Sequence, residues 1–501
     1  MNFAQAIVKE TQKKLTENGA MAYSTTNNAL LDLFGTIGAL RSRSEEDIQA
    51  KFAAAFNENP LLATKMLFYA RDIREGGLGE RRTFRICLVW LSEHYPEIVE
   101  KNILNIFRFG RFDDVLCLLD TPHSNNKELV IDCITEVLKN DIEQITNKKP
   151  CSLLGKWLPS ENASSDKTRK YAKIIRKGLR LSEMEYRKLL SKLRAYIKVV
   201  ERQMSLGKWE EIDYPSVPSY AMLRYRKAFA RRDTQRFSIY LESLKNGETK
   251  VNASTLFPYN LVHNYIQENY WMPSVKIDTV IEEQWKALPN YVNGENNFVI
   301  MADVSGSMYG RPIETSIGLA TYFAQRNNGI YKNLYMTFTD RPHFVSLEDC
   351  KTFREAINKA LSTDVGYSTN LKAAFDYILS TAKENNVSAE ELPKALVVVS
   401  DMEIDPYFPC EASYRGYRAN LDFVETVRKD FEAAGYQLPK LVLWNVEARK
   451  DTFLSQDENI LFVGGQSPSV FKNLCGALEG KTAYDFMLEV LNSKVYDCVI
   501  V

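Results

Sequence analysis

The sequence predicts an α plus α/β fold, in which a helical-repeat first half is followed by a doubly wound α/β second half. Up to about residue 290, apolar residues recur at three- and four-residue spacing, which is typical of amphipathic helices. Beyond that point, short apolar runs alternate with amphipathic stretches. Because 501 residues exceed the usual size of one hydrophobic core, we expect two domains, at 1–292 and 293–501.

The first half begins with a series of helices whose apolar stripes are separated by short breaks containing Gly, Pro or Asn. These helices are expected over residues 28–41, 45–58, 61–74, 82–95 and 96–110. Consecutive helices of this length, without a strict sequence period, predict stacked hairpins in a degenerate HEAT-like solenoid.

The second half begins after the polar, turn-rich segment "YVNGENN" (291–297). Strands are expected at 298–302, 334–338, 395–400, 441–446 and 460–464, and helices at about 312–327, 351–361, 370–385, 420–435 and 467–479. Strands that are apolar on both faces and alternate with helices predict a mostly parallel sheet covered on both sides. Ligands of such sheets bind at the carboxyl ends of the strands.

Composition narrows the class of protein but names no partner. The formal net charge is zero, and the eight cysteines contain no CxxC pair, so a zinc site or a disulfide framework is not expected. The N-terminus lacks the apolar core of a signal peptide, and no apolar run approaches about 18 residues. We therefore expect a cytoplasmic protein without a membrane span.

A cluster of oxygen-bearing side chains follows the first predicted strand, in the sequence "ADVSGSM". Two later loops, "VGYSTNL" and "VVVSDMEID", add a threonine and an aspartate at comparable positions. The resulting set is Asp303, Ser305, Ser307, Thr369 and Asp401. Carboxylates and hydroxyls suit a hard divalent cation, with Mg²⁺ first and Mn²⁺ or Ca²⁺ as alternatives. The alternative is that the serines cap the helix starting near Arg311 and the aspartates are polar strand ends.

The same five positions resemble the metal-ion-dependent adhesion site of von Willebrand factor A domains. That resemblance implies a Rossmann-like domain over 293–501 and a metal with one open coordination position. In that family a carboxylate of a partner, solvent or an anion completes the metal's shell.

Catalysis by the same residues is not expected. A phosphatase of the haloacid dehalogenase type would need a second carboxylate two positions after Asp303, where this chain has Ser305. A serine nucleophile would need a nearby base, and His343 is the one histidine of the second half. The sequence therefore predicts a binding protein and not an enzyme.

Residues 166–250 contain 22 Lys and Arg against 10 Asp and Glu, a surplus of twelve positive charges. Helical spacing groups part of this charge into two stripes: Lys173, Arg176, Lys177 and Arg180, and Arg224, Lys227 and Arg231. Aromatic residues are interleaved with them, a combination that suits single-stranded RNA. The alternative is a solvated basic face above an aromatic core.

Two motifs of the first half are rich in arginine. "RDIREGGLGERR" (71–82) joins two predicted helices through glycines whose N–H groups could face an anion. The glycines could equally serve only to end one helix and begin the next. In "FGRFDDVL" (109–116), Asp113 is expected to cap a helix, and the alternative to an anion-binding role for Arg111 is a solvated side chain.

With "KWLP" (156–159) and "YRKLLSKLR" (186–194), these motifs make the chain similar to Ro (TROVE) proteins, and most similar to a bacterial, phage and plant branch of them. Ro proteins are rings of HEAT-like helices closed by an A domain, and they bind small noncoding or misfolded RNAs. The resemblance thus implies a noncatalytic ribonucleoprotein scaffold. The alternative is a metal-dependent module that binds an acidic residue of a protein partner without RNA. The sequence leaves ring closure and oligomeric state open.

Overall fold

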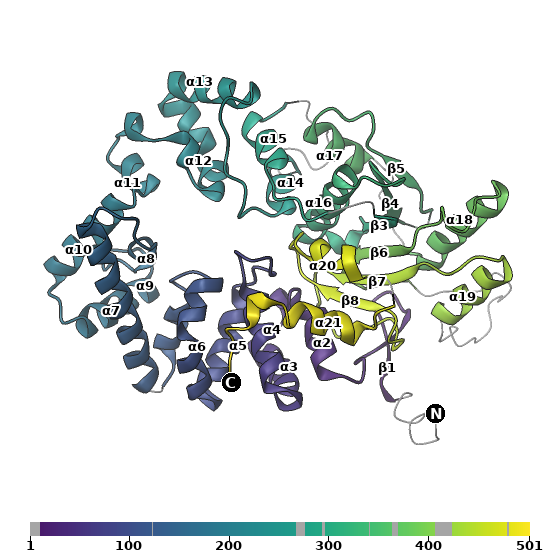
Figure 1. Ribbon diagram of the computed structural model, residues 1–501, viewed down its shortest axis with the longest axis horizontal. Coiled ribbons are helices and arrows are strands. Elements are labelled where there is room, and N and C mark those ends of the chain that lie inside the picture. Colours follow the sequence, from purple (N-terminus) through teal and green to yellow (C-terminus); the bar gives the residue numbers. More distant parts are fainter. Residues whose placement is uncertain are drawn as a thin grey trace. The chain divides into compact units, whose positions relative to one another are not determined.

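The computed structural model describes residues 11–122, 124–266, 276–292, 296–339, 341–362, 369–405, 423–477 and 480–501. It has a largely helical N-terminal region and a six-stranded, mostly parallel C-terminal sheet, as the predicted α plus α/β class requires (Figure 1). The chain divides into two compact units: unit 1 contains residues 1–59 and 256–493, and unit 2 contains 60–255 and 494–501. The boundary expected between 292 and 293 lies inside unit 1.

Unit 2 is helical. Its α-helices are α4 (Pro60–Arg71), α5 (Arg82–His94), α6 (Pro96–Phe109), α7 (Ser124–Thr146), α8 (Leu154–Trp157), α9 (Asp166–Gly178), α10 (Glu183–Tyr196), α11 (Val200–Ser205), α12 (Ser219–Arg232) and α13 (Thr234–Lys245). Short 3₁₀ helices η2 (Val115–Asp120), η3 (Trp209–Glu211), η4 (Tyr214–Ser216) and η6 (Lys494–Tyr496) complete it. The helices expected at 82–95 and 96–110 are confirmed, whereas the one expected at 61–74 ends three residues early, before the glycine-rich loop.

An aromatic core packs the first helices of unit 2 against its C-terminal segment. Phe68 of α4 lies 5.7 Å from Phe109 of α6 between ring centroids, and Phe109 lies 5.4 Å from Tyr496 of η6. The amide of Asn102 donates to the carbonyl of Ile500 at 2.6 Å. Residues 494–501 are therefore part of the packing of this unit.

The sheet of unit 1 has the order β5-β4-β3-β6-β7-β8. Its strands are β3 (Phe298–Asp303), β4 (Leu334–Phe338), β5 (Phe344–Ser346), β6 (Ala395–Ser400), β7 (Lys440–Asn445) and β8 (Leu461–Gly464). All neighbours are parallel except β4 and β5. The five expected strands are confirmed to within one residue. Because β3 pairs with β4 on one side and β6 on the other, the chain order reverses at β3, where ligands of such sheets bind.

Helices pack around this sheet. They are α2 (Ala29–Thr36), α3 (Glu45–Glu58), α14 (Pro258–Ile266), α15 (Thr279–Lys286), α16 (Arg311–Arg326), α17 (Phe353–Ser362), α18 (Leu371–Glu384), α19 (Phe423–Ala433), α20 (Val470–Ala477) and α21 (Ala483–Leu491), with η1 (Leu40–Ser42) and η5 (Gly306–Met308). A hairpin of β1 (Lys13–Leu15) and β2 (Met21–Tyr23) precedes them. Residues 420–422 and 478–479 of two expected helices lie outside the described residues.

The helix expected at 28–41 is interrupted, because α2 ends at Thr36 and a turn brings Gly38 against the backbone of Gly464 at the end of β8.

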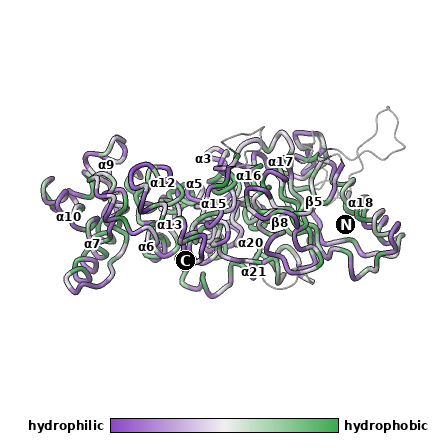
Figure 2. The backbone as a smooth tube through the Cα atoms, turned by 90° about the horizontal axis from the view of Figure 1, so that it is seen from above, coloured by the Kyte–Doolittle hydropathy of each residue, from purple (hydrophilic) through white to green (hydrophobic). Residues whose placement is uncertain are grey.

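The hydrophobic core of unit 1 includes the central strands, where Phe323 of α16 stacks on Phe298 of β3 with ring centroids 4.4 Å apart. Figure 2 shows the hydrophobic residues concentrated around α16 and β8, whereas α9 is largely hydrophilic. In the described ranges, no helix has both the length and the hydropathy needed to cross a bilayer.

Candidate metal centre and basic surface

The loop after β3 holds three of the five predicted ligands. Asp303 is fully buried, and its Oδ1 accepts a hydrogen bond from the backbone N–H of Ser305 at 2.9 Å. The hydroxyl oxygens of Ser305 and Ser307 lie 3.2 Å apart. The N-cap of α16 is Gly310, so the alternative in which the two serines cap this helix is wrong.

Asp401 follows β6, which pairs directly with β3, so that two carboxylates meet at the same edge of the sheet. The hydroxyl of Ser400 donates to Asp303 Oδ2 at 2.5 Å, and Asp401 Oδ1 accepts from the N–H of Glu403 at 3.2 Å. Asp401 Oδ2 is buried and accepts no hydrogen bond within the described residues. Arg449 Nη1 lies 3.3 Å from this oxygen and forms an ion pair with it.

Thr369 is also buried, immediately before α18. Its Oγ1 accepts from the N–H of Asp405 at 3.1 Å and lies 3.4 Å from the carbonyl oxygen of Glu403, to which it donates. These contacts hold Thr369 against the loop that begins at Asp401. The structure therefore brings Asp303, Ser305 and Ser307 together directly, and attaches Thr369 to the loop of Asp401.

Burial and mutual repulsion make the two carboxylates hard to ionise together. Burial, followed by the charge of Asp401, raises the pKa of Asp303 to about 7. Burial also raises the pKa of Asp401, opposed by the Glu403 N–H, the Arg449 guanidinium and the Ser307 hydroxyl. A divalent cation would relieve both effects. The donor set, which is all oxygen with one buried carboxylate oxygen lacking a hydrogen bond, fits Mg²⁺, Mn²⁺ or Ca²⁺.

Sequence reasoning missed three residues around this centre. Arg449 follows β7, the next parallel strand, and the rule that carboxyl ends share one edge could have found it. Ser400 is the last residue of β6 and orients Asp303. Glu403 has the alternate spacing of a ligand, but its carboxylate is turned to the Glu17 N–H and the Thr452 hydroxyl, at 2.5 and 3.2 Å.

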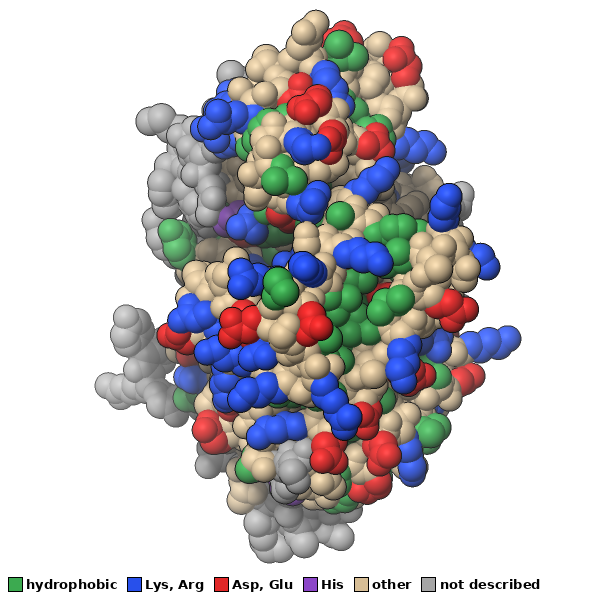
Figure 3. Space-filling model, turned by 90° about the vertical axis from the view of Figure 1, so that its left-hand side faces the viewer, with side chains coloured by type: hydrophobic (Ala, Val, Ile, Leu, Met, Phe, Trp, Pro, Cys, Tyr) green, Lys and Arg blue, Asp and Glu red, His purple; other side chains and the backbone are tan. Residues whose placement is uncertain are grey.

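Most of the predicted basic residues lie on exposed faces of two unit 2 helices. Lys173 and Lys177 of α9, Arg180 after it, and Arg224, Lys227 and Arg231 of α12 are exposed. Arg176 differs, since it is ion-paired with Glu161 at 2.7 Å and donates to the carbonyl of Leu181. Figure 3 shows Lys and Arg side chains gathered on the face of the molecule that forms the left side of Figure 1.

The interleaved aromatic residues are mainly core residues. Tyr186, Phe229 and Phe237 are almost completely buried, whereas Tyr220 is 58% exposed. The alternative of a basic face above an aromatic core therefore holds for most of these rings. Few aromatic rings of this segment are exposed, so few are available to stack on unpaired bases.

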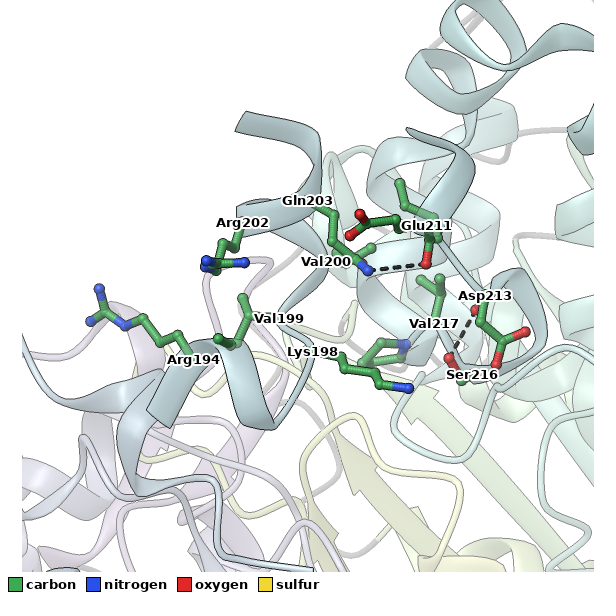
Figure 4. A pocket seen from close by; sticks show the side chains of 13 residues that line it. Arg194, Lys198, Val199, Val200, Arg202, Gln203, Glu211, Asp213, Ser216 and Val217 are labelled. Carbon is green, nitrogen blue, oxygen red and sulfur yellow. Dashed lines mark hydrogen bonds between the residues drawn. The ribbon is translucent and has the colours of Figure 1, made fainter. Parts of the chain in front are cut away.

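A surface cavity of about 570 Å³ lies in the same basic segment, between the α10–α11 turn and the short helices η3 and η4 (Figure 4). Lys198 and Arg202 line it and are exposed. Arg194 lines it too, but its guanidinium donates to the carbonyls of Gly155 and Leu158. The exposed carboxylates of Glu211 and Asp213 line it as well, so its rim carries charges of both signs.

The chain is similar to other proteins along nearly its whole length. A family model described as Domain of unknown function (DUF7788) matches residues 297–488, and one described as Domain of unknown function (DUF2828) matches 16–129 and 168–296. The Uncharacterized protein L728 of Acanthamoeba polyphaga mimivirus is 30% identical over 525 residues, which cover 97% of this chain and 88% of the viral protein.

Proposed function

This chain belongs to the protein family of the mimivirus protein L728, and we propose that it is a noncatalytic binding protein with a divalent cation at the edge of its six-stranded sheet. Asp303, Ser305, Ser307, Thr369 and Asp401 would hold the cation, directly or through water. The observation that carries this proposal is the buried Asp401 Oδ2, which accepts no hydrogen bond within the described residues, is ion-paired with Arg449, and follows the strand that pairs with the strand of fully buried Asp303.

The bound cation would supply a positive charge with a free coordination position for a carboxylate from a protein partner. The sheet order, with its reversal at β3, supports the resemblance to a von Willebrand A domain on which this expectation rests. A binding role is favoured over catalysis because neither Ser305 nor Ser307 is hydrogen-bonded to a histidine or lysine in the described part of the chain. A serine nucleophile needs such a base.

Calorimetric titration of the chelator-treated protein with Mg²⁺, Mn²⁺ and Ca²⁺ tests the site. We expect one saturable site, lost in Asp303→Ala and in Asp401→Asn. Asp349→Asn removes an exposed carboxylate from the same unit and should leave binding unchanged. Equal binding by all four proteins, or no binding at millimolar metal, would overturn the proposal.

RNA binding by unit 2 is the second function that we propose, as part of a Ro-like, HEAT-like ribonucleoprotein scaffold in the cytoplasm. The exposed cations of α9 and α12 support it. The few exposed aromatic rings favour contacts with phosphates over stacking on bases.

Fluorescence anisotropy with a single-stranded RNA, at several salt concentrations, tests this second function. The double variants Lys173→Glu/Lys177→Glu and Arg224→Glu/Arg231→Glu should bind more weakly, with a smaller dependence on salt. Lys127→Glu/Lys139→Glu is a control with the same charge change on α7, where both lysines are also exposed. Arg176 is left intact because its ion pair with Glu161 supports the fold. RNA affinity that depends on neither salt nor the α9 and α12 substitutions would exclude this function.

A further inference from the structure

The two arginine-rich motifs of the first half come together in unit 2. The loop between α4 and α5 contains the glycines, and the loop after α6 contains Arg111, Asp113 and Asp114. The backbone N–H of Ile73 donates to the carbonyl of Phe109 at 3.0 Å, and Arg74 Nη2 donates to that of Gly110 at 3.2 Å. The arginines of both motifs can therefore be considered as one cluster.

The glycine loop does not offer its backbone to an external anion. The buried carboxylate of Asp72 accepts from the N–H groups of Arg74, Glu75 and Gly77 at 2.8, 2.9 and 3.0 Å. It also accepts from the hydroxyl of Tyr496 at 3.1 Å. The anion expected at this loop is thus an aspartate of the chain itself.

Two neighbouring carboxylates hold the other arginines. Asp114 is fully buried and forms ion pairs with Arg71 at 2.6 Å and Arg85 at 2.8 Å. Asp113 forms ion pairs with Arg85 at 3.0 Å and Arg111 at 2.6 Å. The guanidinium of Arg111 is further fixed by the ring of Trp157, with its central carbon 3.8 Å from the ring centroid.

Positive charge exceeds negative charge in this cluster. Arg81 precedes α5 one helical turn before Arg85, which donates its backbone N–H to the carbonyl of Arg81 at 3.1 Å. Arg81 is exposed and forms no ion pair within the described residues. Burial, then the charges of Arg85 and Arg111, lowers its pKa. Around Asp113 and Asp114, four arginines (71, 81, 85 and 111) thus face two aspartates, although residues 71–85 and 109–116 as a whole hold six arginines against five carboxylates.

Hydrogen-bond donors also remain on the partly exposed side chains of Arg85 and Arg111. Arg85 donates Nε to Asp114 and Nη2 to Asp113, whereas Arg111 donates both Nε and Nη2 to Asp113. Nη1 of each makes no hydrogen bond within the described ranges. The guanidinium of Arg81 makes none either. Because the ion pairs and Trp157 fix Arg85 and Arg111, these donors are pre-organised for a planar or tetrahedral oxyanion.

We propose that Arg81, Arg85 and Arg111 form a binding site for a doubly charged phosphate group, either inorganic phosphate or the phosphate monoester of a small molecule. The local excess of positive charge around Asp113 and Asp114 favours a dianion, whereas a phosphodiester of a nucleic-acid backbone carries one negative charge. This site shares no residue with the metal centre or with the basic faces of α9 and α12.

Calorimetric titration of the full chain at about pH 7.5, where phosphate monoesters are mainly dianionic, provides the test. The probes are inorganic phosphate, methyl phosphate and dimethyl phosphate. We expect saturable binding of one or both of the first two, with at least about tenfold weaker affinity for dimethyl phosphate. Binding of inorganic phosphate alone would assign the site to the free ion, and binding of methyl phosphate would extend it to esters.

Arg81→Ala should weaken this binding by about tenfold or more. Arg82→Ala removes the same charge one residue away and should leave affinity unchanged, as should Lys173→Glu/Lys177→Glu. Arg81→Gln serves as a second variant if circular dichroism shows that Arg81→Ala is misfolded. The proposal is overturned by absence of saturable binding, by equal losses in the Arg81 and Arg82 variants, or by equal affinity for the diester, which would assign the cluster to a nucleic-acid backbone.

Discussion

Arg449 lies 3.3 Å from Asp401 through its Nη1 and donates Nη2 to the carbonyl of Ser307 at 2.5 Å. One guanidinium thus touches both the carboxylate and the loop that would hold the cation. Its positive charge partly neutralises the carboxylate of Asp401. Any divalent cation at this centre must bind next to a fixed positive charge, which opposes it.

Removing that charge should strengthen metal binding. We expect Arg449→Gln to raise Mg²⁺ affinity by at least about tenfold, since nearby like charges repel by a few kcal/mol at an effective dielectric constant of about 20 and about 1.4 kcal/mol is tenfold. Calorimetric titration measures the change. Lys450→Gln is the control, because Lys450 carries the same charge on the next residue but pairs with Glu17. Weaker binding in Arg449→Gln would instead show that the arginine organises the loop.

The stability of the metal-free protein should depend on the ionisation of Asp303. The pKa of this buried carboxyl is raised from 3.8 to about 7, so the folded state binds its proton more tightly than the unfolded state. The contribution of Asp303 to the free energy of unfolding is therefore largest below about pH 4, and it falls as the pH rises towards 7. The loss is at most about 4 kcal/mol.

Asp303→Asn should remove this pH-dependent loss, because the amide stays neutral. Without metal, its unfolding temperature should exceed that of the parent protein above about pH 7 and match it near pH 4. Saturating Mg²⁺ should stabilise the parent and leave the variant unaffected. Thermal scans at both pH values, with and without Mg²⁺, measure this. A constant difference between the two proteins across pH would contradict it.

The carboxylate of Asp72 should be critical to unit 2. Asp72→Ala leaves three backbone N–H groups and the Tyr496 hydroxyl without their acceptor, and we expect a loss of about 4 kcal/mol in the free energy of unfolding. Asp72→Asn retains one acceptor oxygen and should lose about 2 kcal/mol. Glu75→Gln, at an exposed position of the same loop, is the control. Urea unfolding compares the three; near-equal stabilities would contradict this role.

The close contact between Gly38 and the end of β8 should leave no room for a side chain at position 38. A Cβ at Gly38 would overlap the backbone of Gly464 and Gly465, so Gly38→Ala should destabilise unit 1 by about 3 kcal/mol. Gly435→Ala adds a methyl group with nothing within 4 Å, where only the φ of +80° is unfavourable, and should lose about 1 kcal/mol. Thermal unfolding distinguishes the two, and equal losses would exclude the steric explanation.

The strands and helices of the second half could be predicted closely because buried parallel strands are continuous apolar runs. Strand β5 escaped prediction because its three residues are too few to show a pattern. The turn at Gly38 was missed because the close approach of two glycines leaves no periodicity in the sequence. Residues 1–59 were assigned to the helical half because helical periodicity does not reveal which sheet a helix packs on.

At the candidate site, strand ends were enough to bring together Asp303 and Asp401. Arg449 was missed because the search was for oxygen donors and not for a cation at the same edge. On the basic helices, spacing alone could not separate Arg176 from Lys173 and Lys177, since its partner Glu161 precedes the helix by several residues. The aromatic residues were ambiguous because core and surface rings have the same helical spacing.

The last eight residues, 494–501, pack in unit 2, although the whole of residues 256–493 comes before them in the chain. During synthesis on the ribosome, Tyr496 reaches Asp72 only after the sheet of unit 1 has been translated. Residues 60–255 must therefore persist as an incomplete fold until residues 494–501 have been made. The maturation of the helical unit is thus tied to the synthesis of the sheet that interrupts it.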